Sequence, residues 1–173
     1  PFQPPLPDPP HDSPKTTPSP PPLFPVLPHQ GPNGEPLGLS TLPLSHPADV
    51  FFDMEGYPLA AGGLEYLFGA CTNVSDSDAL QFHDWWAHDP VAEKKAFEEF
   101  IDWAHARRRQ DPSMHIYHYA AYEKSAIRRL MGRHATREAG VDDFLRNDVL
   151  VDLFTVLRQG FVIGSPGSEG DAL

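Results

Sequence analysis

Residues 50–56, VFFDMEG, form a short β-prone run that ends at a glycine, with a proline two residues later. An apolar run of this length between turn residues is typical of a buried strand. Because side chains alternate across a strand, Asp53 and Glu55 point to one face while Phe52 and Met54 point to the other. The stretch therefore predicts a strand that presents two carboxylates on one surface.

The residues after this strand predict two more strands and then alternating helices and strands. Asp89 and Pro90 supply a helix N-cap and a proline at the first helical position, and apolar residues then recur at helical spacing. The resulting order, βββαβαβ, predicts an α/β fold in which helices flank a mixed central sheet. The further strands are expected at 64–69, 80–86, 115–119 and 149–154, the last as a strand or a strand-to-helix junction, and the helices at about 90–109 and 121–134, with a helical turn at 141–146.

The chain of 173 residues has the length of one domain with tails. Of its 21 prolines, 17 fall within residues 1–47. Proline lacks an N–H donor, so this segment is expected to be disordered or to act as a linker. The predicted domain then covers residues 48–160, and residues 161–173 are expected to form a flexible tail.

The charge and the cysteine content exclude several classes of function. The net charge of −11 repels phosphate, so any binding of nucleic acid must be local or mediated by a metal. Cys71 is the only cysteine, which excludes an internal disulfide, a cysteine-based zinc site and an iron–sulfur cluster held by this chain alone. A reducing, cytoplasmic setting is expected, and the sequence shows neither a membrane span nor a signal peptide.

Asp53 and Glu55 are candidate metal ligands. Two carboxylates at the end of an apolar run repel each other and lose hydration, and a divalent cation would offset both effects. Mg²⁺ and Mn²⁺ prefer such oxygen ligands, and two of these ions about 4 Å apart can clamp the attacking and leaving oxygens of a phosphodiester. The same Asp-x-Glu pattern is also compatible with two solvated acids at a strand end.

Glu123 is the third candidate. It stands in the first turn of the helix predicted after residues 115–119, where complementarity to the helix dipole would be sufficient to explain an acid. Taken together with Asp53 and Glu55, however, it would bring a third oxygen donor to the same edge of the sheet.

Four motifs carry a family resemblance: residues 53–56 (DMEG), 63–69 (GLEYLFG), 115–123 (HIYHYAAYE) and 151–153 (VDL). In wording and order they resemble a bacterial family of RecB-like nucleases. Its members resemble fusions of a RecB-like nuclease, a ribonuclease H-like (YprB-type) domain and a superfamily 1 helicase. The resemblance covers about residues 38–160 and implies a ribonuclease H-like domain of the DEDD exonuclease type.

The resemblance implies a function and a set of site residues. Asp53 and Glu55 match the first DEDD motif and Glu123 matches the second. The acid of the third motif does not occur, so the C-terminal part of the fold is expected to be missing. A complete domain of this type would hydrolyse phosphodiester bonds with two Mg²⁺ or Mn²⁺ ions, in the 3′ to 5′ direction. Its expected partners are nucleic acid, with DNA favoured over RNA, and the helicase and RecB-like nuclease domains of a longer product.

Other residues are expected around this site. Asp152 and His118 would support the metal ligands without being principal ligands, and a capping role is the alternative for Asp152. Arg128, Arg129 and Arg133 would contact phosphates, or would form a solvated helix face. The alternative function is a ribonuclease H-like scaffold or nucleic-acid-binding module without catalysis.

Overall fold

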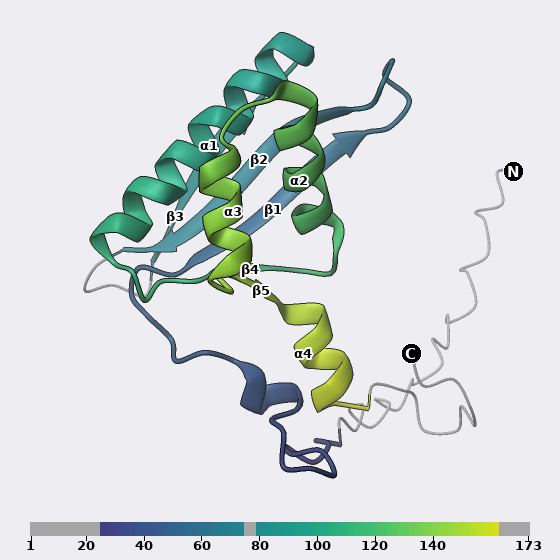
Figure 1. The fold of residues 1–173 in the computed structure, drawn as a ribbon, viewed down its shortest axis with the longest axis vertical. Helices are drawn as coiled ribbons and strands as arrows, with labels where there is room; N and C mark the ends of the chain where they lie inside the picture. The colour runs from purple at the N-terminus through teal and green to yellow at the C-terminus, as the bar shows by residue number, and fades with distance from the viewer. Residues whose placement is uncertain (1–24, 75–78, 163–173) are drawn as a thin grey trace, which may run out of the picture.

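The computed structural model describes residues 25–74 and 79–162, which form a five-stranded mixed sheet with the helices between residues 90 and 146 on one face (Figure 1). The strands lie in the order β3-β2-β1-β4-β5, and β1 pairs antiparallel with β2 and parallel with β4. This confirms the predicted α/β fold. The elements are η1 (Gly38–Thr41), β1 (Val50–Tyr57), β2 (Leu64–Asn73), β3 (Leu80–Trp86), α1 (Pro90–Gln110), β4 (Ile116–His118), α2 (Tyr122–His134), α3 (Glu138–Arg146), β5 (Leu150–Asp152) and α4 (Leu153–Gly160).

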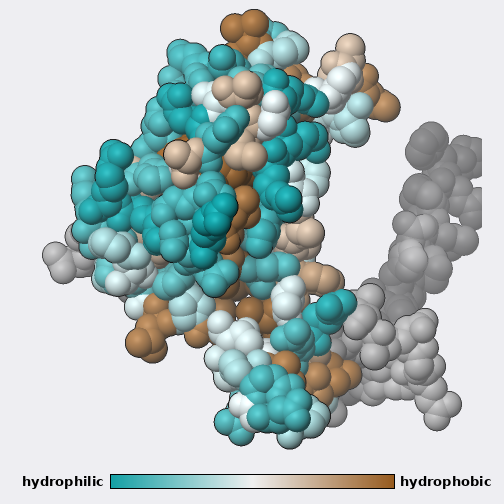
Figure 2. Space-filling model, viewed as in Figure 1, coloured by the Kyte–Doolittle hydropathy of each residue, from teal (hydrophilic) through white to brown (hydrophobic). Residues whose placement is uncertain are grey.

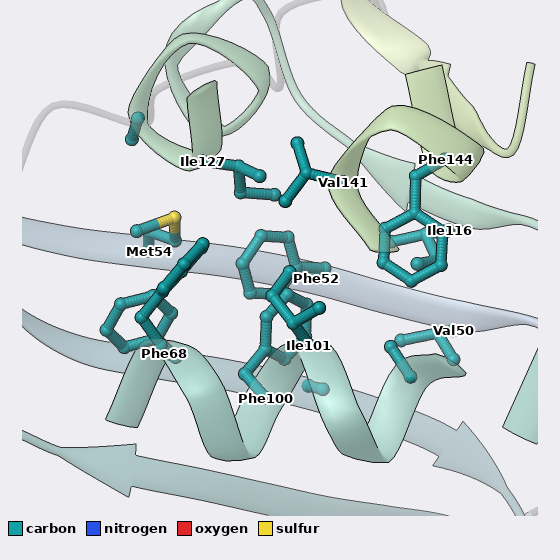
Figure 3. Close-up of a cluster of buried hydrophobic side chains, with 14 of the residues drawn as sticks. Val50, Phe52, Met54, Phe68, Phe100, Ile101, Ile116, Ile127, Val141 and Phe144 are labelled. Carbon is teal, nitrogen blue, oxygen red and sulfur yellow. The ribbon is translucent and has the colours of Figure 1, made fainter. Parts of the chain in front are cut away.

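Strand β1 has the alternation that its sequence predicts. Phe52 and Met54 are buried, whereas Asp53 and Glu55 are exposed on the opposite face. The buried side of the strand packs against α1, where the ring of Phe100 stacks on that of Phe52 with centroids 4.1 Å apart. One core therefore lies between the sheet and the helices (Figure 3).

Helix α1 begins where the sequence predicts. The carboxylate of Asp89 accepts hydrogen bonds from the backbone N–H groups of Val91 and Ala92, each at 2.8 Å. These bonds satisfy two of the donors that a helix start leaves open. Within the described residues, no helix is long and apolar enough to cross a membrane.

The end of the fifth strand is a strand-to-helix junction. Asp152 is the last residue of β5 and the N-cap of α4, and its Oδ1 accepts from Phe154 N at 2.9 Å. Its Oδ2 accepts from Thr155 Oγ1 at 2.8 Å. The capping role of Asp152, one of the two alternatives from the sequence, is therefore present in the structure.

Part of the segment predicted to be disordered is ordered. Within residues 25–47, η1 packs on α4, and Leu27 N donates to Gly160 O at 2.8 Å. Gly38 has φ +56°, and a Cβ there would lie 2.5 Å from the Cα of Gly160, so the two backbones approach as closely as glycines allow. The proline content shows that this segment has few backbone N–H donors. It gives no information about α4, which lies more than 100 residues later in the chain and provides the surface on which η1 packs. Residues 1–24 and 163–173 lie outside the described residues.

Replacing Phe100 by alanine is expected to destabilise the fold strongly. The ring is fully buried and contacts Phe52, Phe68 and Trp85, so its removal leaves a cavity at the centre of the core. We expect a loss of about 3–5 kcal/mol in the free energy of unfolding, measured by urea denaturation. Val91→Ala, at an exposed position of the same helix, is the control and should change stability by less than about 0.5 kcal/mol. Equal effects of the two substitutions would contradict this assignment of the core.

Candidate functional site

Two of the three predicted acids meet at one edge of the sheet. Asp53 lies on β1, and Glu123 lies in the first turn of α2, directly after β4. Asp53 lies close enough to Glu123 to raise the pKa of Glu123. Two carboxyl groups this close disfavour each other's charged form, so the proximity of Asp53 favours a proton on Glu123.

Glu123 is the more perturbed acid of the pair. The residue is only 3% exposed. Burial is the largest cause that raises the pKa of Glu123 to about 7; a hydrogen bond from its own backbone N–H offsets part of this, and Asp53 and Asp152 raise the pKa further. Its Oε2 is buried and has no hydrogen-bond partner among the described residues. The site thus contains a buried acid without a lysine or arginine partner in the described part of the chain.

His118 lies against this acid. Its Nδ1 donates to the carbonyl oxygen of Ala120 at 2.8 Å and lies 3.4 Å from Glu123 Oε2. Burial lowers the pKa of His118, which favours the neutral ring. Its Nε2 is buried without a hydrogen-bond partner in the described part of the chain. A neutral imidazole cannot neutralise Glu123, so the acid stays uncompensated.

Glu55, the third predicted ligand, lies in the same groove as the pair. It is exposed and lines an open groove that Asp53, Glu123 and His118 also line. However, residues 25–74 and 79–162 contain no group of three or more His, Cys, Asp or Glu side chains arranged to hold a metal ion. The structure brings Asp53 and Glu123 together and leaves Glu55 beside them.

The groove also has an aromatic wall. Phe51 stacks on Tyr117 with ring centroids 5.5 Å apart, and the exposed rings of Phe82 and Tyr119 line the same groove. These rings lie on the face of the sheet that carries Asp53. The opposite side of the molecule, where the helices lie, is largely hydrophilic in Figure 2.

Asp152 reaches the site through the backbone. Its Oδ1 accepts from Ala120 N at 2.9 Å, in the turn that joins β4 to α2. Burial alone would raise the pKa of Asp152, but hydrogen bonds from Thr155, Ala120 and Phe154 lower it overall. Asp152 is therefore charged and fixed, and it holds the turn that precedes Glu123.

The predicted arginines differ from one another in their contacts. Arg129 forms an ion pair with Glu65, and Arg133 pairs with Glu93 at 3.0 Å and donates to Gly63 O at 3.1 Å. Arg128 is exposed and makes no ion pair within the described residues. Arg129 and Arg133 thus neutralise buried acids. The sequence analysis had considered only phosphate contacts and a solvated helix face for them.

Two of the buried acids that the sequence analysis missed have partners on α2. Glu65 is 3% exposed and Glu93 is fully buried. Glu93 stands in the first turn of α1, where an acid is expected for dipole reasons alone. The sequence did contain a signal for Glu65, which lies between apolar residues of β2. An acid that is buried with such a strand is expected to have a cationic partner.

Comparison with known families gives a match over most of the described fold. The sequence profile of the RNase H superfamily matches residues 50–168, which include every strand and helix from β1 to α4. Comparisons with curated proteins and with solved structures gave no match. The match covers well over half of the chain and begins at the strand that carries Asp53, and on this basis the chain belongs to the RNase H superfamily.

Proposed function

We propose that this domain is a metal-dependent nuclease that hydrolyses phosphodiester bonds in nucleic acid, with Asp53, Glu55 and Glu123 as the acids that hold the metal. The observation that carries the proposal is the pairing of Asp53 with Glu123. Two acids lie close together at the edge of a ribonuclease H-like sheet, where each disfavours the charge of the other, and Glu123 Oε2 is buried with no hydrogen-bond partner in the described residues.

The donor set fits a hard divalent cation. Carboxylate oxygens are the ligands that Mg²⁺ and Mn²⁺ prefer, and a cation between Asp53 and Glu123 would allow both acids to be charged. Glu55 lines the same groove, and we propose it as the third donor. When bound, such a cation polarises a phosphoryl oxygen and lowers the pKa of a coordinated water.

The residues around the pair have supporting roles in this proposal. Neutral His118 contacts Glu123 and excludes solvent from its carboxylate. Asp152 holds the turn before α2 through Ala120 N. Exposed Arg128 is proposed as a phosphate contact, since its guanidinium is not occupied by an acid in the described part of the chain.

The finer features of the proposal depend on the motif resemblance. It supports DNA as the substrate, cleavage in the 3′ to 5′ direction, two metal ions in the complete site, and helicase and RecB-like nuclease domains as neighbours in a longer product. None of these features changes which residues of this chain hold the metal.

A non-catalytic module is the second candidate function. It is favoured by one specific observation, namely that the three acids do not form a metal-holding group of three in the described residues. In that case the groove would bind nucleic acid through its aromatic wall, since bases stack on exposed rings without a metal. Binding that persists in EDTA and weakens with salt would favour this candidate over the nuclease.

Substitution of either paired acid is expected to weaken metal binding. Asp53→Asn and Glu123→Gln each keep the size of the side chain but remove one charge from the donor set. We expect each variant to lose at least about 10-fold in Mn²⁺ affinity, measured by calorimetry, because even residues behind the ligands contribute that much. Cleavage of a labelled single-stranded DNA in Mn²⁺ should fall in parallel.

Glu99→Gln is the matched control. Glu99 is an exposed acid on α1, and among the described residues its carboxylate pairs only with the exposed Lys95, at 3.7 Å. Its substitution removes the same charge from the chain and should leave Mn²⁺ affinity unchanged. Wild-type affinity in the Asp53→Asn variant would contradict the assignment of the site.

The pH dependence of stability provides a test that needs no metal. Below pH 4.5 Glu123 is protonated in both the folded and the unfolded chain, so it contributes no difference. As the pH rises to about 7, the unfolded chain releases this proton while the folded chain retains it, and folding is progressively disfavoured. The penalty is about 3 kcal/mol above pH 7.

Glu123→Gln is therefore expected to be more stable than wild type at pH 8 by up to about 3 kcal/mol, and equal to it near pH 4.5. The glutamine amide mimics the protonated acid and can donate to Asp53. Urea denaturation in EDTA at the two pH values measures the difference. If Glu123→Gln differed from wild type by the same free energy of unfolding at pH 4.5 and at pH 8, burial would not disfavour the charged form of Glu123.

A further inference from the structure

The start of helix α2 has no side-chain N-cap. Its N-cap, Ala121, has no side chain that can accept a hydrogen bond, and Ala120 before it has a left-handed backbone with φ 67°. An alanine in that conformation is strained by about 1 kcal/mol. Glu123 stands in this first turn, so its position depends on contacts other than a cap.

Tyr122 provides such a contact. Its hydroxyl donates to Glu65 Oε2 at 2.8 Å, and Arg129, two turns further along α2, donates to Glu65 Oε1. Both oxygens of a buried carboxylate on β2 are thus occupied by side chains of α2. Since an unpaired buried carboxylate is costly, Glu65 and the two α2 side chains hold one another in place.

This contact lies directly against β1. A Cβ at Gly56 would lie 2.3 Å from the hydroxyl oxygen of Tyr122 and 2.5 Å from Glu65 Oε2, so only glycine leaves room for the bond. Gly56 directly follows Glu55, and its partner across the β1–β2 register is Glu65. The Tyr122–Glu65 hydrogen bond therefore joins β2, at the residue that pairs with Gly56 of β1, to the first turn that carries Glu123.

A second buried acid fixes the other end of α2. Glu65 N donates to Glu93 Oε1 at 2.7 Å, and Glu93 accepts from Arg133 at 3.0 Å and from His134 at 2.8 Å. Arg133 and His134 belong to the last turn of α2. The helix is thus tied at both ends to the β1–β2 hairpin and to α1, through two acids that are themselves joined.

We propose that Glu65 and Tyr122 are positioning residues, which hold Glu123 against Asp53 without touching substrate or metal. The inference rests on the proposed function, because it assigns importance to the place of Glu123. It also explains how α2, which has no side-chain N-cap, can hold the proposed metal ligand Glu123 at a fixed position.

The experiment compares four variants of the full chain. Tyr122→Phe removes only the hydroxyl, Glu65→Ala removes the acceptor, and Glu65→Gln keeps an acceptor of the same size. Tyr66→Phe is the matched control, because the neighbouring Tyr66 on β2 makes no hydrogen bond through its hydroxyl in the described residues. Amide hydrogen exchange by NMR in EDTA reports on the opening of the first turn of α2, through the backbone N–H groups of residues 125–127 that follow it, with the amides of α1 as the reference. Calorimetry measures Mn²⁺ affinity.

We expect exchange at residues 125–127 to accelerate about 10-fold or more in Tyr122→Phe and Glu65→Ala, with α1 unchanged, because local opening of the first turn no longer breaks the hydrogen bond. Mn²⁺ affinity should fall several-fold in the same two variants. Glu65→Gln should restore most of both properties, which a general loss of stability would not predict, and Tyr66→Phe should match wild type.

Two results would overturn the inference. One is wild-type exchange at residues 125–127 in both Tyr122→Phe and Glu65→Ala. The other is faster exchange with Mn²⁺ affinity equal to that of wild type, which would separate the hydrogen bond from the position of Glu123. Failure of the wild-type chain to bind Mn²⁺ would instead count against the proposed function, and the exchange measurement, which needs no metal, would then decide the inference alone.

Discussion

The candidate site depends on the parallel pairing of β1 with β4. Val50 pairs with Ile116 and Phe51 with Tyr117, so both strands run toward the same edge of the sheet. The chain leaves β4 at that edge and turns directly into α2, which places Glu123 beside Asp53. An antiparallel pairing would carry the start of α2 to the opposite edge, and the two acids would not meet.

The buried acids of this fold are stabilised in different ways, and this difference marks the site. Glu65 and Glu93 have arginine or histidine partners that compensate their charge. Glu123 is as deeply buried as Glu65, yet its neighbours are another acid and a neutral imidazole. A carboxylate kept in an environment that disfavours its charge is typical of a functional position, because a purely structural role would be better served by a paired or apolar side chain.

The sequence contains enough information for the strands, the long helix and the approach of Asp53 to Glu123. Alternation in residues 50–56 and the Asp89 cap are local signals, and the meeting of the acids follows from strand order. The Tyr122–Glu65 and Arg133–Glu93 contacts join residues 57 and 40 positions apart, so no local pattern indicates them. The packing of η1 on α4 likewise depends on a surface formed more than 100 residues later.

The turn between β4 and α2 is a strained segment that hydrogen bonds hold in place, and it lies next to Glu123, the buried acid whose charged form is disfavoured. Ala120 adopts a left-handed conformation, yet its N–H donates to Asp152 and its carbonyl accepts from His118. Each bond to a charged or buried partner contributes about 1 kcal/mol or more, which is comparable to the strain. The turn can therefore persist only when β5 lies beside β4, since Asp152 is the last residue of β5. The position of Glu123 is consequently determined from both sides, by β1 and β2 through Tyr122 and by β5 through Ala120.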